Sequence, residues 1–213
     1  LIALWHLAKG ARPANVDEFI DPSLLPANCQ IAALVGDSLD PSNGLTTDGV
    51  TTYTLWGEIA RQLGPEAWEK MALSDENRES PGKQTWLEIF GDTPTVIVID
   101  EIAQYLRQLV ASGSGETQRL AEATIHMLKV LFEAATSAPA VRVIVTLATG
   151  TKAFGVETTE IAAQLFDVAA QGLIDEANDV MGRPKGAIGR PAKDEEIGYI
   201  LRRRLFESVD ESA

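Results

Sequence analysis

Three short apolar runs constrain the fold of this chain more than any other feature. They are QIAALVGD at 30–37, TPTVIVID at 93–100 and VRVIVTLA at 141–148. Each is apolar throughout, without the alternation that marks a strand with one face in water. Such strands belong to parallel sheets covered on both faces, and segments with helical spacing separate the three runs. The sequence therefore predicts an α/β fold with a parallel sheet flanked by helices.

The remaining elements follow from helical spacing and from turn residues along the 213-residue chain. We expect a long loop at 40–52, which is dense in Asp, Asn, Gly and Thr, and a polar connection at 75–83. We also expect one sheet-containing region over 1–181, followed by a loop and a last helix over 182–213. Helices are predicted over 1–9, 54–64, 66–74, 85–91, 102–111, 116–136, 159–172 and 194–206.

Composition narrows the classes of protein that this chain can belong to. It holds 31 acidic and 18 basic residues, a net charge of −13, which argues against this segment as the main contact to nucleic acid. Its single cysteine, Cys29, excludes an internal disulfide framework, and His6 and His126 lack the spacing of metal ligands. No apolar run is long enough to cross a bilayer. We expect a cytoplasmic protein without a membrane span.

Two adjacent carboxylates, Asp100 and Glu101, end the second apolar run. A strand of β-branched residues that ends in Asp-Glu fits the Walker B arrangement of P-loop ATPases. In that arrangement Asp100 holds Mg²⁺ through water, and Glu101 orients the water that attacks the γ-phosphate. The alternative is that both acids cap the following helix, where negative charge is favourable. Thr146, near the tip of the third run, is a candidate polar sensor of the γ-phosphate.

A phosphate-binding loop of the form G-x-x-x-x-G-K-[ST] is missing from the sequence. The Gly82-Lys83 pair does not qualify, because Asn77 replaces the first Gly and Gln84 replaces the Ser or Thr. The opening LIALWHLAK resembles the buried helix that follows such a loop. We therefore expect the loop and its strand to precede Leu1 in a longer protein, and we expect residues 1–213 alone to bind ATP weakly.

The chain resembles a family of large bacterial AAA-type ATPases, long catalogued as a domain of unknown function, from gene clusters similar to restriction or phage-defence systems. The resemblance implies a nucleoside-triphosphatase core that uses ATP and Mg²⁺, and a homo-oligomer within a DNA-modification or defence complex. It places the metal on Asp100, water activation on Glu101 and the sensor role on Thr146. The similar stretches are LIALWHLAKG, GDSLDPSNG, TTYTLWGEIARQLG, SPGKQTWLEIF, TPTVIVIDEIAQYLRQL and DEEIGYILRRRLFE.

The same resemblance implies an arginine that reaches the site of a neighbouring subunit and stabilises transition-state charge. Arg190, before Pro191 and the last predicted helix, is the candidate, and Arg183 is the alternative. Both can equally be solvated loop arginines. The run 202–204 is interpreted as a solvated helix end that complements the helix dipole.

Two other functions stay open at this point. One is a scaffold or regulatory module with an inactive nucleotide site, which a degraded upstream phosphate loop would favour. The other is a RecA-like translocase, which would require further motor motifs and a basic DNA track, and neither is visible in the sequence.

Overall fold

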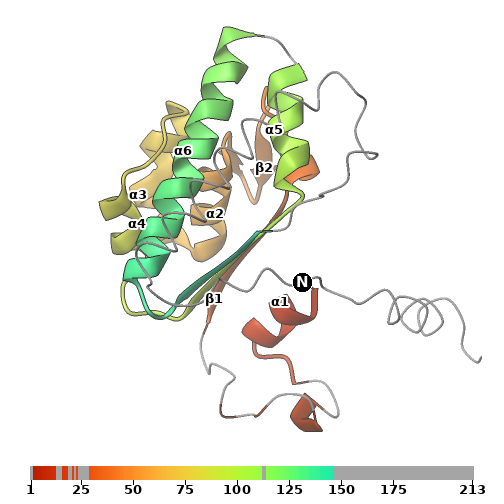
Figure 1. Ribbon diagram of the computed structural model, residues 1–213, viewed down its shortest axis with the longest axis vertical. Coiled ribbons are helices and arrows are strands. Elements are labelled where there is room, and N and C mark those ends of the chain that lie inside the picture. The colour runs from red at the N-terminus through yellow and green to blue at the C-terminus, as the bar shows by residue number, and fades with distance from the viewer. Residues whose placement is uncertain are drawn as a thin grey trace, which may run out of the picture. The chain divides into compact units, whose positions relative to one another are not determined.

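The computed structural model describes residues 2–12, 16–18, 21, 23, 29–111 and 114–145. All of them belong to one compact unit, Leu1–Leu173. Its centre is a three-stranded parallel sheet with the order β1-β4-β5 (Figure 1). The strands are β1 (Gln30–Val35), β4 (Thr95–Asp100) and β5 (Val141–Val145). The predicted parallel sheet, and its three strands up to residue 145, are therefore confirmed.

Helices connect the strands where the sequence predicts them. Between β1 and β4 lie α2 (Leu55–Leu63), α3 (Pro65–Glu76) and α4 (Lys83–Phe90). Between β4 and β5 lie α5 (Ile102–Ala111) and α6 (Gly115–Ser137). The first helix, α1 (Ile2–Ala8), ends before Gly10, whose φ of 87° is a conformation that suits glycine. The helices predicted at 159–172 and 194–206 lie outside the described residues.

One face of the sheet carries the main core. Ala32 on β1 pairs with Ile97 on β4, and both have no exposed surface. They pack in one cluster with side chains of α2, α4, α5 and α6, among them the fully buried Trp56 and Trp86. Burial of such large apolar groups is the dominant stabilising contribution in a core of this kind.

The other face of the sheet is covered separately. Ile31 on β1 and Val98 on β4 are buried but lie outside the main core cluster. The helix α1 contacts β1, and its Ala8 is buried outside that cluster too. Side chains alternate between faces along a strand, so α1 belongs to this second face.

The segment 40–52, which the sequence predicted as a loop, contains a β-hairpin. The strands β2 (Leu45–Thr47) and β3 (Val50–Thr52) pair antiparallel, and Thr47 faces Val50 across the turn Asp48-Gly49. Both turn residues have positive φ, 52° and 80°, as the favoured two-residue hairpin turn requires. The loop prediction was wrong there, although the segment does begin with a turn, in which Asp40 accepts hydrogen bonds from the amides of Ser42 and Asn43.

A side-chain amide closes the outer edge of β1. Gln62 on α2 accepts a hydrogen bond from the Ala33 amide (2.8 Å) and donates one to the Ala33 carbonyl (3.1 Å). It thereby takes the place of a neighbouring strand's peptide group. An unpaired edge is a template for association with other strands, so this amide protects the sheet as well as stabilising it.

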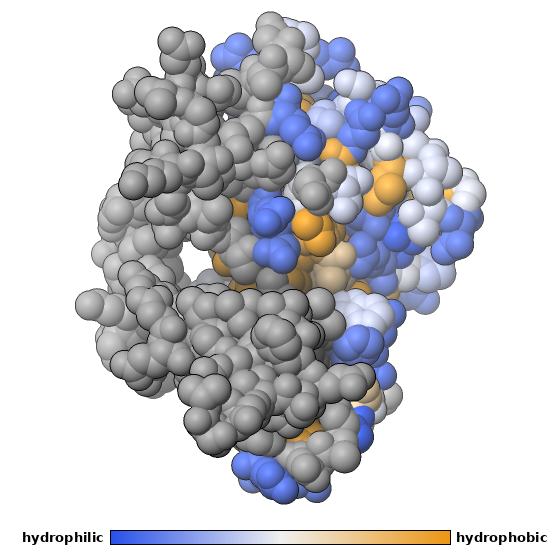
Figure 2. Space-filling view, turned by 90° about the vertical axis from the view of Figure 1, so that its right-hand side faces the viewer, coloured by the Kyte–Doolittle hydropathy of each residue, from blue (hydrophilic) through white to orange (hydrophobic). Residues whose placement is uncertain are grey.

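Hydrophilic residues cover most of the described surface on the side shown in Figure 2, with apolar residues in small groups between them. No helix among the described residues has both the length and the apolar character to cross a membrane.

Gln62→Ala should expose the edge of β1. We expect the free energy of unfolding to fall by about 1–2 kcal/mol, because two backbone groups lose their partner, and we expect more self-association. Urea unfolding and size-exclusion chromatography measure both effects. Gln84→Ala is the matched control, since its exposed side chain bonds only Glu88. Equal stability of the two variants would contradict the role of Gln62.

Candidate active site at the carboxyl end of the central strand

Asp100 and Glu101 stand where ligands bind in parallel α/β sheets, at the carboxyl end of a strand. Strand β4 lies between β1 and β5, and Asp100 is its last residue, paired with Val35. Asp100 is half-buried and Glu101 is exposed. Apolar neighbours fix the strand from both sides, since Ile97 and Ile99 are fully buried on one face and Val98 on the other. A rigid strand therefore holds the first acid, and the second follows directly.

The backbone of Glu101 is in an unusual conformation. Its φ is 54°, in the left-handed region that residues with a Cβ rarely adopt. The positive φ of Asp48 is explained by its hairpin turn, but Glu101 joins a strand to α5 with no such turn. Strain of this kind costs on the order of 1–3 kcal/mol, persists only where the surroundings enforce it, and is concentrated at functional sites.

The end of β1 contacts this strained residue. Gly36 begins the short 3₁₀ helix Gly36–Ser38, which follows β1 directly and packs against α5. A Cβ placed on Gly36 would lie 2.3 Å from the carbonyl oxygen of Glu101 and 3.0 Å from its carbonyl carbon. The two strand ends therefore touch through their backbones.

A buried carboxylate organises the segment that leads from the hairpin into α2. Asp75 on α3 is 1% exposed and accepts hydrogen bonds from the Tyr53 amide, the Thr54 amide and the Thr54 hydroxyl. Thr54 in turn caps α2 by accepting from the Gly57 amide at 3.0 Å. Burial raises the pKa of Asp75, and these hydrogen bonds offset that effect only in part.

Asp75 also lies near α5, the helix that follows Glu101. Tyr105 on α5 is fully buried, and burial together with the negative charge of Asp75 raises the pKa of its hydroxyl. This cluster was not predicted, because Asp75 falls in the segment 75–83, which was expected to be a polar connection, whereas α3 extends to Glu76. Its buried position depends on where α3 packs, which local sequence does not show.

A second buried carboxylate, Glu58 on α2, links the hairpin to the edge of β1. Glu58 is 2% exposed and accepts hydrogen bonds from Thr52 (2.9 Å), from Arg61 (2.6 and 2.8 Å) and from Gln62 (2.8 Å). Burial raises the pKa of Glu58, but the hydrogen bonds from Arg61, Gln62 and Thr52 outweigh it and leave the pKa below its usual value. Every acceptor position of this carboxylate is thus used for structure.

The acids at the end of β4 suit a hard cation that keeps most of its water. Among the described residues, no group of three or more His, Cys, Asp and Glu side chains is placed to hold a metal. A cage made wholly of protein ligands is therefore absent from this part of the chain. Mg²⁺ is commonly bound by only one or two carboxylates together with phosphate oxygens and water. Asp100 fits that requirement.

The structure brings together only two of the predicted site residues, Asp100 and Glu101. Thr146, Arg190 and the alternative Arg183 lie outside the described residues. Gly82 is the N-cap of α4 and Lys83 is the first residue of that helix, which follows the connection from α3. That position does not follow a strand, which agrees with the exclusion of this pair as a phosphate-binding loop.

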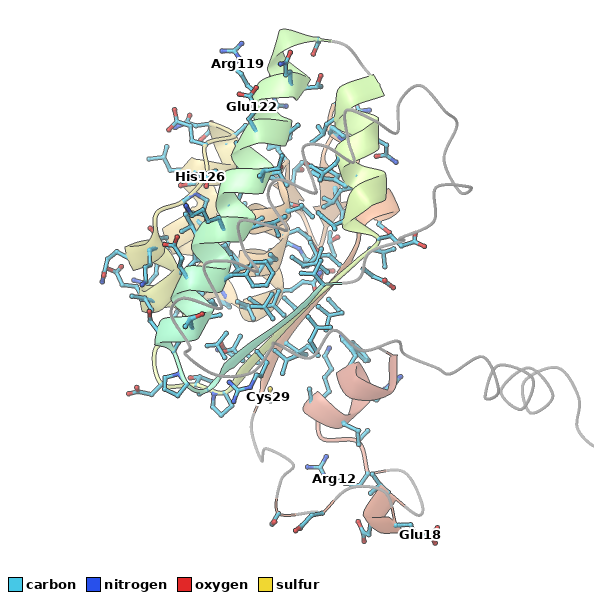
Figure 3. The ribbon with its side chains drawn as sticks, in the orientation of Figure 1. Arg12, Glu18, Cys29, Arg119, Glu122 and His126 are labelled. Atoms are coloured by element: carbon cyan, nitrogen blue, oxygen red, sulfur yellow. The ribbon has the colours of Figure 1, made fainter. Side chains whose placement is uncertain are left out.

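Other reactive side chains lie away from this site. His126 on α6 shares a 3.0 Å hydrogen bond with Ser80, and it is exposed (Figure 3). Cys29 precedes β1 and so lies at the amino end of the sheet, opposite Asp100 (Figure 3). Burial raises the pKa of this thiol, which makes it less reactive.

Comparison with protein families gives a match that covers most of the chain. Residues 12–182 match the model of the DUF499 N-terminal domain. The chain belongs to this family. The matched range includes the whole sheet, both buried carboxylate networks and the Asp100-Glu101 pair, so all of these are part of the DUF499 N-terminal domain. Comparison with curated proteins and with solved structures finds no match.

Glu58 should make the stability of this DUF499 domain depend on pH. Because its pKa is lower in the folded state, it stabilises the fold above its unfolded pKa of about 4.3, and this contribution is lost as the pH falls through the folded pKa. Between about pH 5 and pH 3, we expect the free energy of unfolding of Glu58→Gln to fall less steeply than that of wild type. Denaturant unfolding across that range tests this, with the exposed Glu69→Gln as control. An unchanged slope in Glu58→Gln would contradict it.

Proposed function

We propose that this chain is part of an ATP-binding and ATP-hydrolysing enzyme of the AAA type, with the nucleotide site at the carboxyl end of β4. The observation that carries the proposal is the placement of Asp100 and Glu101 at the end of the central strand of a parallel sheet, with Glu101 in a strained conformation. A helix-capping role alone gives no reason for that strain.

Each acid has a distinct role in the proposed reaction. Asp100 would hold hydrated Mg²⁺, which would supply positive charge toward the phosphates of bound ATP. Glu101 would accept a hydrogen bond from the attacking water, orient it and take its proton as the new oxygen–phosphorus bond forms and the bond from the γ-phosphorus to ADP breaks, which releases ADP and phosphate. Glu101 is an exposed residue, so water reaches this position of the chain.

The topology supports a specific place for the phosphate-binding loop. The crossovers from β1 to β4 and from β4 to β5 pack their helices into one core on one face, whereas α1 lies on the other face. Crossovers between parallel strands are almost always right-handed. The crossovers on the core face move along the sheet from β1 to β4 to β5, so a right-handed crossover on the opposite face must move in the reverse direction, from the β5 side toward β1. The crossover through α1 ends at β1. A strand that leads into α1 would then pair beyond β5.

The edge of β1 supports the same placement, because Gln62 already occupies it. In our proposal a strand upstream of α1 pairs next to β5 and carries the phosphate loop at its carboxyl end. The site would then lie at the point where crossovers change face, which is the usual ligand position in such sheets. The sequence resemblance extends the proposal to a homo-oligomer acting in a DNA-modification or phage-defence complex.

Glu101→Gln in the full-length protein should retain ATP but slow its hydrolysis. The change keeps the shape of the side chain and removes the charge that polarises water, an effect of about 10²- to 10⁴-fold. ATP affinity and turnover should be measured side by side with Glu69→Gln, an exposed acid on α3. Turnover of Glu101→Gln at the wild-type rate would mean that Glu101 only caps α5.

Asp100→Ala should weaken nucleotide binding only when Mg²⁺ is present. Loss of the residue that holds the hydrated ion should reduce Mg-ATP affinity by about tenfold or more, with little change in the presence of a chelator. Asp92→Ala is the matched control, because Asp92 is exposed and precedes β4 at the opposite end of the strand. Equal losses with and without Mg²⁺ would contradict a metal role.

A further inference from the structure

A glycine is needed at position 36 because a Cβ has no room there, and not because the backbone of this residue has a positive φ. Positive φ is found at Gly10, Gly44, Gly49, Gly64 and Gly91 among the described glycines, but not at Gly36. A Cβ at Gly36 would meet backbone atoms instead: the carbonyl oxygen of Glu101 at 2.3 Å, its carbonyl carbon at 3.0 Å and the amide nitrogen of Tyr105 at 3.3 Å. Backbone atoms that follow a strand directly or belong to a helix cannot move aside as the end of a flexible side chain can.

The contact falls on the residue whose conformation needs an explanation. Glu101 has a φ of 54°, and a residue with a Cβ keeps that conformation only if its surroundings enforce it. The parallel pairing of Val35 with Asp100 brings the next residues of the two strands, Gly36 and Glu101, together. Tyr105 is fully buried one turn along α5, so the helix that follows Glu101 is anchored as well.

We propose that Gly36 is a positioning residue for Glu101. By lacking a side chain, it lets the Glu101 carbonyl pack against the end of β1, and that packing keeps Glu101 in the left-handed conformation that aims its carboxylate at the nucleotide site. This inference rests on the proposed function of Glu101, but its geometric part can be tested without any activity.

The central experiment is a double-mutant cycle in the full-length protein. Gly36→Ala should lower the kcat of ATP hydrolysis by about tenfold or more, because a misplaced catalytic group is costly, and should leave nucleotide affinity within about twofold, because Gly36 is not expected to touch the phosphates. Gly115→Ala is the matched control, since Gly115 has nothing within 4 Å of an added Cβ. Its kcat should match wild type.

The cycle separates positioning from a merely structural role. If Gly36 acts through Glu101, adding Gly36→Ala to Glu101→Gln should lower kcat no further. The proposal is overturned if Gly36→Ala lowers kcat by the same factor in wild type and in Glu101→Gln. It is also overturned if Gly36→Ala alone has the kcat of wild type. If Glu101→Gln itself hydrolyses ATP at the wild-type rate, the proposed function fails instead, and the conformational test below decides whether the geometric part holds.

The conformational test compares Glu101→Gly with Glu101→Ala. Glycine adopts positive φ without strain, whereas alanine does not, so Glu101→Gly should have an unfolding equilibrium constant about tenfold smaller than Glu101→Ala. In the Gly36→Ala background this difference should disappear, because the enforcing contact has changed. If Gly36→Ala does not fold, Glu101→Gly and Glu101→Ala are still compared in the protein that keeps Gly36. Equal stabilities of these two variants would overturn the proposal, because Glu101 would then have no left-handed conformation to maintain.

Discussion

The parallel pairing of β1 with β4 is the interaction on which the rest of this structure depends. It aligns Gln30 through Val35 with Thr95 through Asp100, so both strands end at the same edge of the sheet. That register places Gly36 against the backbone of Glu101 and fixes Asp100 at the tip of the central strand. A shift by one residue would turn each β1 side chain to the opposite face, including the fully buried Ala32, which explains why the pairing is so strongly specified.

Two buried carboxylates hold the surrounding segments in place without being available for catalysis. Glu58 joins the β2–β3 hairpin to α2 through Thr52, and its partner Gln62 closes the edge of β1. Asp75 binds the start of α2 from α3. The hydrogen bonds outweigh the effect of burial on the pKa of Glu58, whereas those of Asp75 offset it only in part. Glu101, in contrast to these two residues, is exposed to solvent.

Local pattern predicted the sheet, because continuous apolar runs between helical segments have few other solutions. It also predicted that Asp100 and Glu101 stand at the end of a strand, while their roles in a site stay predictions. The hairpin was missed although Asp48-Gly49 is a strong turn signal, since its short strands are mostly threonine and lack an apolar pattern. Glu58, Asp75 and the Gly36 contact could not be predicted, because each depends on which distant residues the packing brings near. Thr146 and Arg190 remain predictions.

The most direct test of a metal-nucleotide site at the end of β4 is cleavage of the backbone by radicals generated at the bound metal. In the full-length protein, Fe²⁺ replacing Mg²⁺ generates radicals in the presence of ascorbate and peroxide, and these cut the nearest backbone. Mass spectrometry should locate ATP-dependent cuts at residues 100–101 and, on the adjoining strand end, at 36–38. Cuts that do not depend on ATP, or that fall only elsewhere in the chain, would contradict the account.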